Sequence, residues 1–366
     1  MARNPYSVDK LASHPEALGK MRKTGEGTLI TVHLMPQNAC NHRCAFCAYR
    51  LPDNKNEVEF NEKAHIPWRH MLSLLDDLES MGVQGIEVSG GGEPLAYPYS
   101  GELWSALALR PFATALVTNG TLLTEAMAPA ITAKMKWARV SIDAASAATY
   151  AQMRLCPERH WRKAWDAVRL LRESAPADPE FKLGVGFVLS NENMGEVQEF
   201  VKMAAESGAD NCRLTATFSD RNLDYFHDRK ALARAIGAAT EAEAKFSSKT
   251  FHVHNLLHTR AWEIAHPVQD YKRCPIKDFI CVVEGEGKVY SCCTFTGSTK
   301  GCYGKFHEHP GGFRGLWEEG DLWRRTLVAS DYCTNACLYR DRNIAMNELI
   351  DGLQEEGPEH VHKEFI

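Results

Sequence analysis

Residues 29–47 read LITVHLMPQNACNHRCAFC, a run of apolar and β-branched residues that leads into three closely spaced cysteines. The first part, Leu29–Leu34, predicts a buried β-strand. Cys40, Cys44 and Cys47 then form a C-x3-C-x2-C run in the loop after that strand. Three thiolates at this spacing can wrap one face of a [4Fe–4S] cube and leave its fourth iron open. A zinc site would instead be expected to close with a fourth Cys or His at short spacing.

The composition is that of a globular protein with a sizeable core, because 44% of the 366 residues are hydrophobic and 24% are charged. A net charge of −5 does not favour direct nucleic-acid binding. No apolar run is long enough to span a membrane, and no signal-peptide pattern opens the chain, so we expect a cytoplasmic protein. In a reducing compartment the twelve cysteines point to metal binding or catalysis rather than to disulfides.

Short apolar runs alternate with amphipathic helical patterns between residues 28 and 220. This order predicts a parallel sheet in a partial (β/α)6 TIM-like barrel, with the chemistry at the C-terminal ends of the strands. The expected helices include Trp68–Met81, Leu123–Met135 and Trp161–Glu173. The expected strands are Leu29–Leu34, Gly85–Val88, Ala113–Thr118, Trp137–Ile142, Lys182–Leu189 and Cys212–Thr217.

The remaining chain predicts a second, smaller α+β unit that is rich in cysteine. A helix at Lys230–Phe246 leads into it, and a last helix at Asn343–Leu353 follows it. His252 and His254 alternate on one strand face, where we expect hydrogen-bonded or solvated imidazoles rather than metal ligands. The predicted division is an N-terminal extension (1–27), a core (28–225), a helical connector (226–273), the cysteine-rich unit (274–353) and a frayed charged tail (354–366).

Seven cysteines lie between Cys274 and Cys337. Cys274, Gly287 and Cys292 follow the spacing C-x12-G-x4-C, which predicts a β-hairpin with a thiolate near each end. Cys333 and Cys337 add a C-x3-C pair, so four cysteines can close a second metal site. That site can be an iron–sulfur cluster or a four-cysteine zinc site. Three further cysteines could replace any of these ligands, namely Cys281, Cys293 and Cys302.

The first motif resembles the signature of the radical S-adenosylmethionine (SAM) superfamily, in which an aromatic residue, here Phe46, precedes the last cysteine. Ser89–Pro94 follows the second predicted strand and is similar to the GGEP motif of that family. The resemblance implies that SAM binds the open iron of a [4Fe–4S] cluster through its amino and carboxylate groups. It also implies that the reduced cluster cleaves SAM to a 5′-deoxyadenosyl radical, which abstracts hydrogen from a substrate.

The same resemblance predicts the residues that contact SAM. Ser141 and Asp143 could instead serve as ordinary strand-end caps. Arg154 could pair with a carboxylate of SAM or of the substrate, or form a surface ion pair. The GGEP turn is expected to meet the SAM amino group, since glycines allow close approach and a carboxylate suits an ammonium group. The full set of expected SAM-site residues is Phe46, Gly91, Gly92, Glu93, Pro94, Asn119, Ser141, Asp143 and Arg154.

The cysteine-rich unit resembles the SPASM/twitch extension of the same family, although C-x2-C would be the more usual final pair. Because Cys337 is the last cysteine, the resemblance implies one auxiliary iron–sulfur cluster, expected to be [4Fe–4S]. In relatives such a cluster accepts or relays an electron, which would give an oxidation or rearrangement. A thiol that returns a hydrogen atom would give epimerisation instead. Candidate donors are Cys156, Cys212 and Cys302, each of which can also be a buried small hydrophobe.

The expected activity is therefore that of a radical SAM enzyme with a small-molecule or nucleoside-like substrate. Only about 28 residues precede the first strand, too few for a leader-peptide recognition domain. A ribosomal-peptide-modifying epimerase or cross-linking enzyme is the alternative. A non-catalytic zinc or iron–sulfur electron-transfer module is the alternative from another class. The expected partner is a reductant such as flavodoxin or ferredoxin, and no membrane association is expected.

Overall fold

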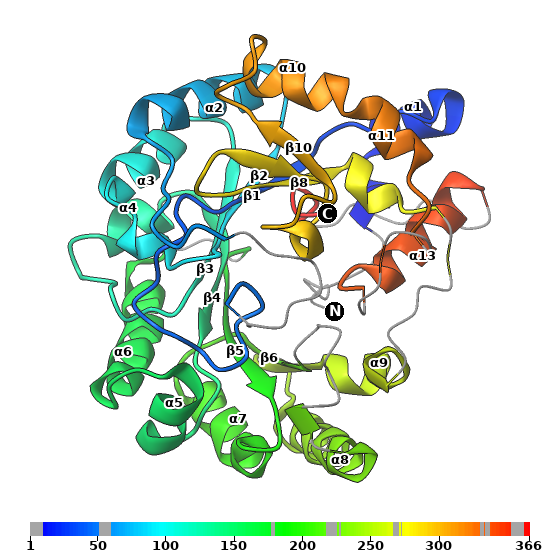
Figure 1. Cartoon of the computed structure of the whole chain (residues 1–366). Coiled ribbons are helices and arrows are strands. Elements are labelled where there is room, and N and C mark those ends of the chain that lie inside the picture. Colours follow the sequence, from blue (N-terminus) through cyan, green and yellow to red (C-terminus); the bar gives the residue numbers. More distant parts are fainter. Residues whose placement is uncertain are drawn as a thin grey trace.

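The fold was analysed in a computed structural model of the chain (Figure 1). The structure describes residues 10–50, 60–176, 180–216, 225–226, 228–265, 271, 273–329, 333, 337–352 and 362–366. Within these residues, no helix is both long and apolar enough to cross a membrane.

A single ten-stranded sheet organises the molecule, in the order β10-β9-β8-β1-β2-β3-β4-β5-β6-β7. Strands β1 to β7 are all parallel to their neighbours, and helices lie around the outside of the curved sheet (Figure 1). Their bounds are β1 Thr31–Leu34, β2 Gly85–Val88, β3 Ala113–Thr118, β4 Met135–Ser141, β5 Lys182–Leu189, β6 Asn211–Ala216 and β7 His252–Asn255. The predicted TIM-like α/β barrel is confirmed.

Two details of the barrel differ from the prediction. The helix expected at Leu123–Met135 is the short α4, Ala128–Thr132, because Met135 already begins β4. The segment expected as a helical connector contributes a seventh parallel strand, β7, which carries His252 and His254. The other helices are α1 Pro15–Thr24, α2 Trp68–Ser80, α3 Ser100–Ala108, α5 Ala147–Arg154, α6 Arg159–Ser174, α7 Val197–Glu206, α8 Arg229–Phe246, α9 Leu256–Ala265, α10 Gly312–Glu319, α11 Asp321–Thr326 and α13 Arg340–Ile350.

The core lies between the outer face of the sheet and these helices. Alternate strand residues such as Leu183 and Val185 on β5 are fully buried there, in the same core cluster as Phe200 and Ala204 on α7. Burying such a side chain contributes roughly 1.5–3 kcal/mol. The intervening residues of each strand face the inside of the barrel, which leaves that side for polar groups.

The predicted hairpin is present as β8 (Ile280–Val283) and β9 (Lys288–Tyr290), with Gly287 in its turn at φ +78°. It does not stand apart from the barrel, because β8 pairs in parallel with β1 and extends the same sheet. Strand β10, Cys302–Lys305, adds an antiparallel edge. The boundary between a core and a cysteine-rich domain therefore stays a prediction.

The segment His362–Ile366 corrects the expectation of a frayed tail. The Phe365 carbonyl accepts from Lys10 Nζ at 2.8 Å, and the Ile366 amide donates to Thr31 Oγ1 at 3.1 Å. The Phe365 ring meets Trp137 edge-on at 5.7 Å. This segment therefore packs across the N-terminal ends of the barrel strands, which form the lower end of the barrel. Its apolar side chains are buried there. The rest of the predicted tail lies outside the described residues, as do Leu353 and Thr217.

Candidate active site

The cysteine loop follows β1 and docks onto the end of α5. The Arg43 amide donates to the Arg154 carbonyl at 3.0 Å, and the Ala45 amide donates to the Met153 carbonyl at 2.9 Å. These backbone bonds fix the loop without using the cysteine thiols. Cys44 is therefore held at the C-terminal end of the barrel, where the fold places chemistry.

The three predicted cluster ligands converge in this loop. Burial raises the pKa of the Cys44 thiol to about 12, and Cys47 and Cys40 are near enough to add to the shift. Two cations stand beside the sulfurs: Arg50 Nη1 is 3.5 Å from Cys47 Sγ, and Arg154 Nη1 is 4.0 Å from Cys44 Sγ. Three convergent sulfurs flanked by donors fit an anionic iron–sulfur cluster, whose properties depend on hydrogen bonds to its sulfurs.

An amide network ties this loop to the loop after β3. Asn119 Nδ2 donates to Asn41 Oδ1 at 2.8 Å, and Asn41 Nδ2 donates to Thr121 Oγ1 at 2.8 Å. Thr121 closes the circuit by donating to Asn119 Oδ1 at 2.7 Å. Asn119 was expected at the SAM site, whereas the structural roles of Asn41 and Thr121 were missed. The position of Asn41 inside the cysteine motif was a sequence signal that could have indicated its role.

Glu93 holds the glycine-rich turn after β2 in place, and its carboxylate points into the protein rather than toward solvent. The Glu93 carboxylate accepts from Thr118 Oγ1 at 2.5 Å, from the Asn119 amide at 2.8 Å and from the Leu95 amide at 3.1 Å. Both of its oxygens are thus used inside the protein, and only 2% of the residue is exposed. The expected pairing of this carboxylate with the SAM ammonium stays a prediction, because three of its roughly four acceptor sites are already used inside the protein. The turn can offer its backbone carbonyls instead.

Asp143 and Arg154 form a buried ion pair at the C-terminal end of β4. The other Asp143 oxygen accepts from the Val188 amide at 2.8 Å, and Arg154 Nε donates to the Ile142 carbonyl at 3.2 Å. The reading of Arg154 as a surface ion-pair residue is therefore wrong. Asp143 is not a simple strand cap either, since it joins the ends of β4 and β5 to the cysteine loop.

Four of the expected SAM-site residues line one cavity of about 120 Å³. They are Phe46, Ser141, Asp143 and Arg154. They come from the cysteine loop, the end of β4 and α5, which are far apart in the sequence. The structure brings these residues together beside the triad.

A larger cavity of about 320 Å³ lies inside the barrel. Ser89 and Gly90 line it near the glycine-rich turn, and Phe365 and Ile366 line it at the lower end. Its wall also includes Tyr49, beside the cysteine loop. A small molecule held in this cavity would therefore lie between the triad side and the closed lower end.

The second set of predicted ligands also meets in one place. Cys274, Cys292, Cys333 and Cys337 all line a small cavity of about 20 Å³ beside η5 (Pro275–Asp278). The pKa of the Cys274 thiol is raised mainly by burial, and Cys337, Cys292 and Cys333 add to it. Of the spare cysteines, Cys281 lies in the main core instead.

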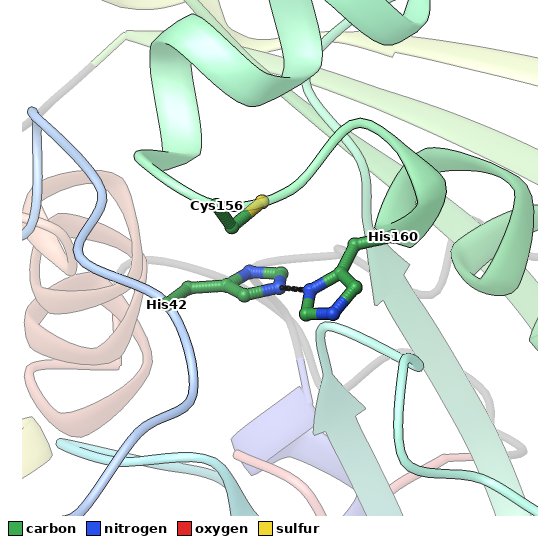
Figure 2. A group of neighbouring side chains, drawn as sticks. All are labelled: His42, Cys156 and His160. Atoms are coloured by element: carbon green, nitrogen blue, oxygen red, sulfur yellow. Dashed lines mark hydrogen bonds between the residues drawn. The ribbon is translucent and has the colours of Figure 1, made fainter.

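The three predicted hydrogen donors are spread over the molecule. Cys212 is fully buried in the core between the sheet and the helices. Cys156 stands beside His42 and His160, whose Nε2 and Nδ1 atoms are 3.0 Å apart (Figure 2). Cys302 packs with Tyr290 at the far edge of the sheet. None of them is among the residues that line the larger cavity.

The sequence marked Cys293 only as a possible replacement ligand, and its position at the barrel cavity was not expected. It lines the larger cavity, whereas its neighbour Cys292 lines the cavity of the second cysteine set. Its Sγ lies 3.7 Å from Tyr339 Oη, and Tyr339 lines both cavities. One peptide unit therefore joins the wall of the second cysteine site to the wall of the barrel cavity.

The fold and the site together define an enzyme that uses SAM and a [4Fe–4S] cluster. Residues 34–204 match the family model of the radical SAM superfamily, which assigns this part of the chain to that superfamily. It is 24% identical to the AdoMet-dependent heme synthase of Methanosarcina barkeri over 313 residues, 78% of this chain and 81% of that protein. It is 29% identical to the S-adenosylmethionine-dependent nucleotide dehydratase of Flammeovirga pacifica over 126 residues, which span only 34% of this chain and 42% of that protein.

Solved structures agree on the fold. SuiB of Streptococcus suis bound to precursor peptide SuiA matches with a TM-score of 0.64 at 14% identity, over 98% of this chain and 80% of that chain. Native anSMEcpe with bound AdoMet matches with a TM-score of 0.61 at 14% identity, over 88% of this chain and 96% of that chain. At these identities the matches establish the architecture alone.

Proposed function

We propose that the chain is a two-cluster radical SAM enzyme acting on a small-molecule or nucleoside-like substrate in the barrel cavity. Cys40, Cys44 and Cys47 hold the SAM-binding cluster. SAM lies in the cavity lined by Phe46, Ser141 and Arg154, where Arg154 faces its carboxylate. When bound and reduced, the cluster supplies the electron that cleaves SAM to a 5′-deoxyadenosyl radical, which takes hydrogen from the substrate. The observation that carries the proposal is the placement of that cavity beside the triad.

We assign an auxiliary iron–sulfur cluster to Cys274, Cys292, Cys333 and Cys337. The competing zinc site would hold its thiolates at about 2.3 Å from one ion, so the sulfurs would lie within about 4 Å of one another. A search of the described residues for three possible metal-ligand atoms that all lie within 4.8 Å of one another finds His42, Cys156 and His160. It does not find a group made of the four thiols. The four thiols share a cavity at a wider spacing, which supports a multi-iron cluster.

The adjacent positions of Cys292 and Cys293 support an electron-accepting role for the auxiliary cluster. Cys292 faces that cluster site, and Cys293 faces the substrate cavity. An electron from a substrate radical therefore has a short covalent route out of the cavity, which favours net oxidation or rearrangement. Cys293 also replaces Cys156, Cys212 and Cys302 as the thiol placed to return a hydrogen atom.

The small-molecule assignment rests on the presence of the barrel cavity, and it is consistent with relatives named as a heme synthase and a nucleotide dehydratase. A peptide substrate is the second candidate. The SuiB structure with its bound precursor peptide shares the fold and keeps this alternative open. A flavodoxin or ferredoxin would act as the electron donor.

The test is anaerobic reconstitution with iron and sulfide, followed by dithionite and SAM. Release of 5′-deoxyadenosine is expected from the wild type and from the control Cys212→Ala, and not from Cys44→Ala. Adding SAM should also change the electron paramagnetic resonance spectrum, because only an open-iron cluster binds it. If Cys44→Ala released as much 5′-deoxyadenosine as the wild type, the assignment would be wrong. Zinc in place of iron would support the non-catalytic module instead.

A further inference from the structure

A histidine of the cysteine loop lies beside two residues from the region where α5 ends and α6 begins (Figure 2). His42 stands between Cys40 and Cys44, and it is separated from His160 by 118 positions in the sequence. One possible ligand atom from each of His42, Cys156 and His160 lies within 4.8 Å of the other two. Tertiary contact alone therefore creates this group of two imidazoles and a thiol.

The two imidazole rings meet through one nitrogen each. His42 Nε2 lies 3.0 Å from His160 Nδ1, so one nitrogen donates a hydrogen and the other offers its lone pair. Two protonated rings could not make this contact, because both nitrogens would then be donors. At least one of the rings is therefore neutral, and neutral imidazole is the form that binds metal ions.

This hydrogen bond leaves part of the His42 ring unsatisfied. His42 is 1% exposed, and its Nδ1 atom has no hydrogen-bond partner among the described residues. The ring is held edge-on to Tyr150, with the ring centres 5.9 Å apart. An unpaired buried nitrogen costs free energy, whereas most buried polar atoms are paired. Coordination of an ion by this ring would offset that cost.

The residue before Cys156 has a strained backbone. Leu155 ends α5 in the left-handed region at φ +46°, which is unfavourable for leucine, and 59% of the residue is exposed. Burial of its own side chain therefore does not explain the conformation. The turn ends α5 just before Cys156, whose thiol lies beside the two imidazoles. Backbone strain of this kind is often found where a side chain is placed for a function.

The group matches the donor types of a zinc site. Two imidazole nitrogens and a thiolate are zinc ligands, and three protein ligands leave one tetrahedral position for water. With Zn–N distances of about 2.0–2.1 Å, two nitrogens on one tetrahedral zinc lie roughly 3.3 Å apart. The 3.0 Å between the His42 and His160 nitrogens is slightly shorter, because a hydrogen atom joins them. An ion in its place requires the rings to turn and to move apart by a few tenths of an ångström.

We propose that His42, Cys156 and His160 bind one zinc ion, with water in the fourth position. Binding releases a proton from the Cys156 thiol and transfers no electron. Each imidazole keeps its hydrogen on the nitrogen that faces away from the ion. The ion joins the cysteine loop to α6, in addition to the backbone bonds from Arg43 and Ala45 that hold this loop on the end of α5. The inference goes beyond the proposed function, because it uses none of the predicted cluster ligands.

Zinc binding is measured on the fully reconstituted protein, so that the cysteines of both proposed clusters are already occupied. The protein is dialysed against zinc sulfate and then against metal-free buffer, and its zinc and iron are counted by mass spectrometry. We expect about one zinc per chain, with the iron content unchanged. Zinc X-ray absorption should show nitrogen at about 2.0–2.1 Å and sulfur at about 2.3 Å.

His160→Gln and Cys156→Ala each remove one ligand from a half-buried position. Each should weaken zinc binding by about tenfold or more, measured by competition with a chromophoric chelator. Unchanged iron content and circular dichroism show that the variants have folded. The matched controls are His258→Gln, an exposed histidine on α9, and Cys212→Ala in the core. Both controls should bind zinc as the wild type does.

The proposal is overturned if the wild type retains no zinc, or if both ligand variants bind zinc as tightly as the wild type. Zinc surrounded by sulfur alone would also overturn it, because the ion would then have entered a cysteine cluster site. Failure of the proposed function would show separately, as the absence of 5′-deoxyadenosine release from a wild type that still binds zinc through nitrogen and sulfur.

Discussion

Arg154 joins Asp143 to Cys44: its guanidinium pairs with the Asp143 carboxylate and places Nη1 4.0 Å from the Cys44 sulfur. Asp143 itself has a left-handed backbone at φ +66°, and its carbonyl accepts from Asn193 Nδ2 at 2.9 Å. Both charged residues are buried, at 4% and 1% exposure. The pair therefore couples the end of β4 to the cluster loop.

Replacing Arg154 by alanine leaves the Asp143 carboxylate buried without its partner. Breaking a buried ion pair on one side costs about 3–5 kcal/mol of the free energy of unfolding. Denaturant unfolding of the reconstituted protein measures this loss, and the SAM-dependent spectral change should disappear with it. The exposed variant Arg169→Ala should stay within about 0.5 kcal/mol of the wild type. Equal stability of the two variants would show that the buried pair is not structurally required.

Gly92 tests how closely the glycine-rich turn must approach the cysteine loop. A Cβ atom there would lie 2.1 Å from the Ala39 carbonyl oxygen, a backbone atom that cannot move without the loop. Gly92→Ala should therefore lower the free energy of unfolding by about 3 kcal/mol and reduce the iron content.

Gly101 in α3 provides the control for this substitution. Nothing lies within 4 Å of a Cβ atom at that position. Gly101→Ala should raise the free energy of unfolding by about 0.5–1 kcal/mol, since alanine is the better helix former. Thermal melts of the two variants should thus shift in opposite directions. A shift in the same direction would contradict the clash that the structure implies at Gly92.

Cys337→Ala tests the auxiliary cluster. The wild type should hold about eight irons per chain after reconstitution, and the variant about four, because one [4Fe–4S] cluster loses a ligand. Cys281→Ala should keep the full iron content, since Cys281 lies in the main core. Iron and sulfide analysis gives the result. Retention of all the iron in Cys337→Ala would remove that residue from the ligand set and point to a spare cysteine.

Glu284 gives a pH dependence that can be measured. It lies in the turn after β8 and accepts from Asn38 Nδ2 at 2.8 Å, and burial raises the pKa of its carboxyl above the usual 4.5. A raised acid pKa means that the folded state binds more protons than the unfolded state. Stability attributable to Glu284 therefore decreases as pH rises from 4.5 through the folded-state pKa.

The variant Glu284→Gln isolates this contribution because it keeps the shape and cannot ionise. The difference in free energy of unfolding, wild type minus variant, should fall as pH rises above 4.5 and then level off. Urea unfolding of the apoprotein across that range measures it. A difference that grows with pH would mean that the folded state favours the ionised carboxylate, contrary to the burial of Glu284.

Much of the barrel could be predicted because its strands are short apolar runs, and such runs can be recognised from neighbouring residues in the sequence alone. A strand carrying His252 and His254 was expected, but its place as the seventh parallel strand of the barrel was not, because pairing with β6 is not a local property of the sequence. The packing of Phe365 and Ile366 under the barrel could not be read from a charged tail, since burial there depends on a surface made by β1 and β4.

The sequence by itself determined the predicted chemistry. The spacing of Cys40, Cys44 and Cys47 and the glycine-rich turn predict a cluster and a SAM site, because ligand type and local spacing are properties of the chain. Only the tertiary structure decided which residues share a space. It paired Asp143 with Arg154, turned Glu93 inward, and brought Cys292 and Cys293 to two different cavities. It also placed His42 beside Cys156 and His160, and contacts between segments so far apart in the chain are encoded by no local pattern.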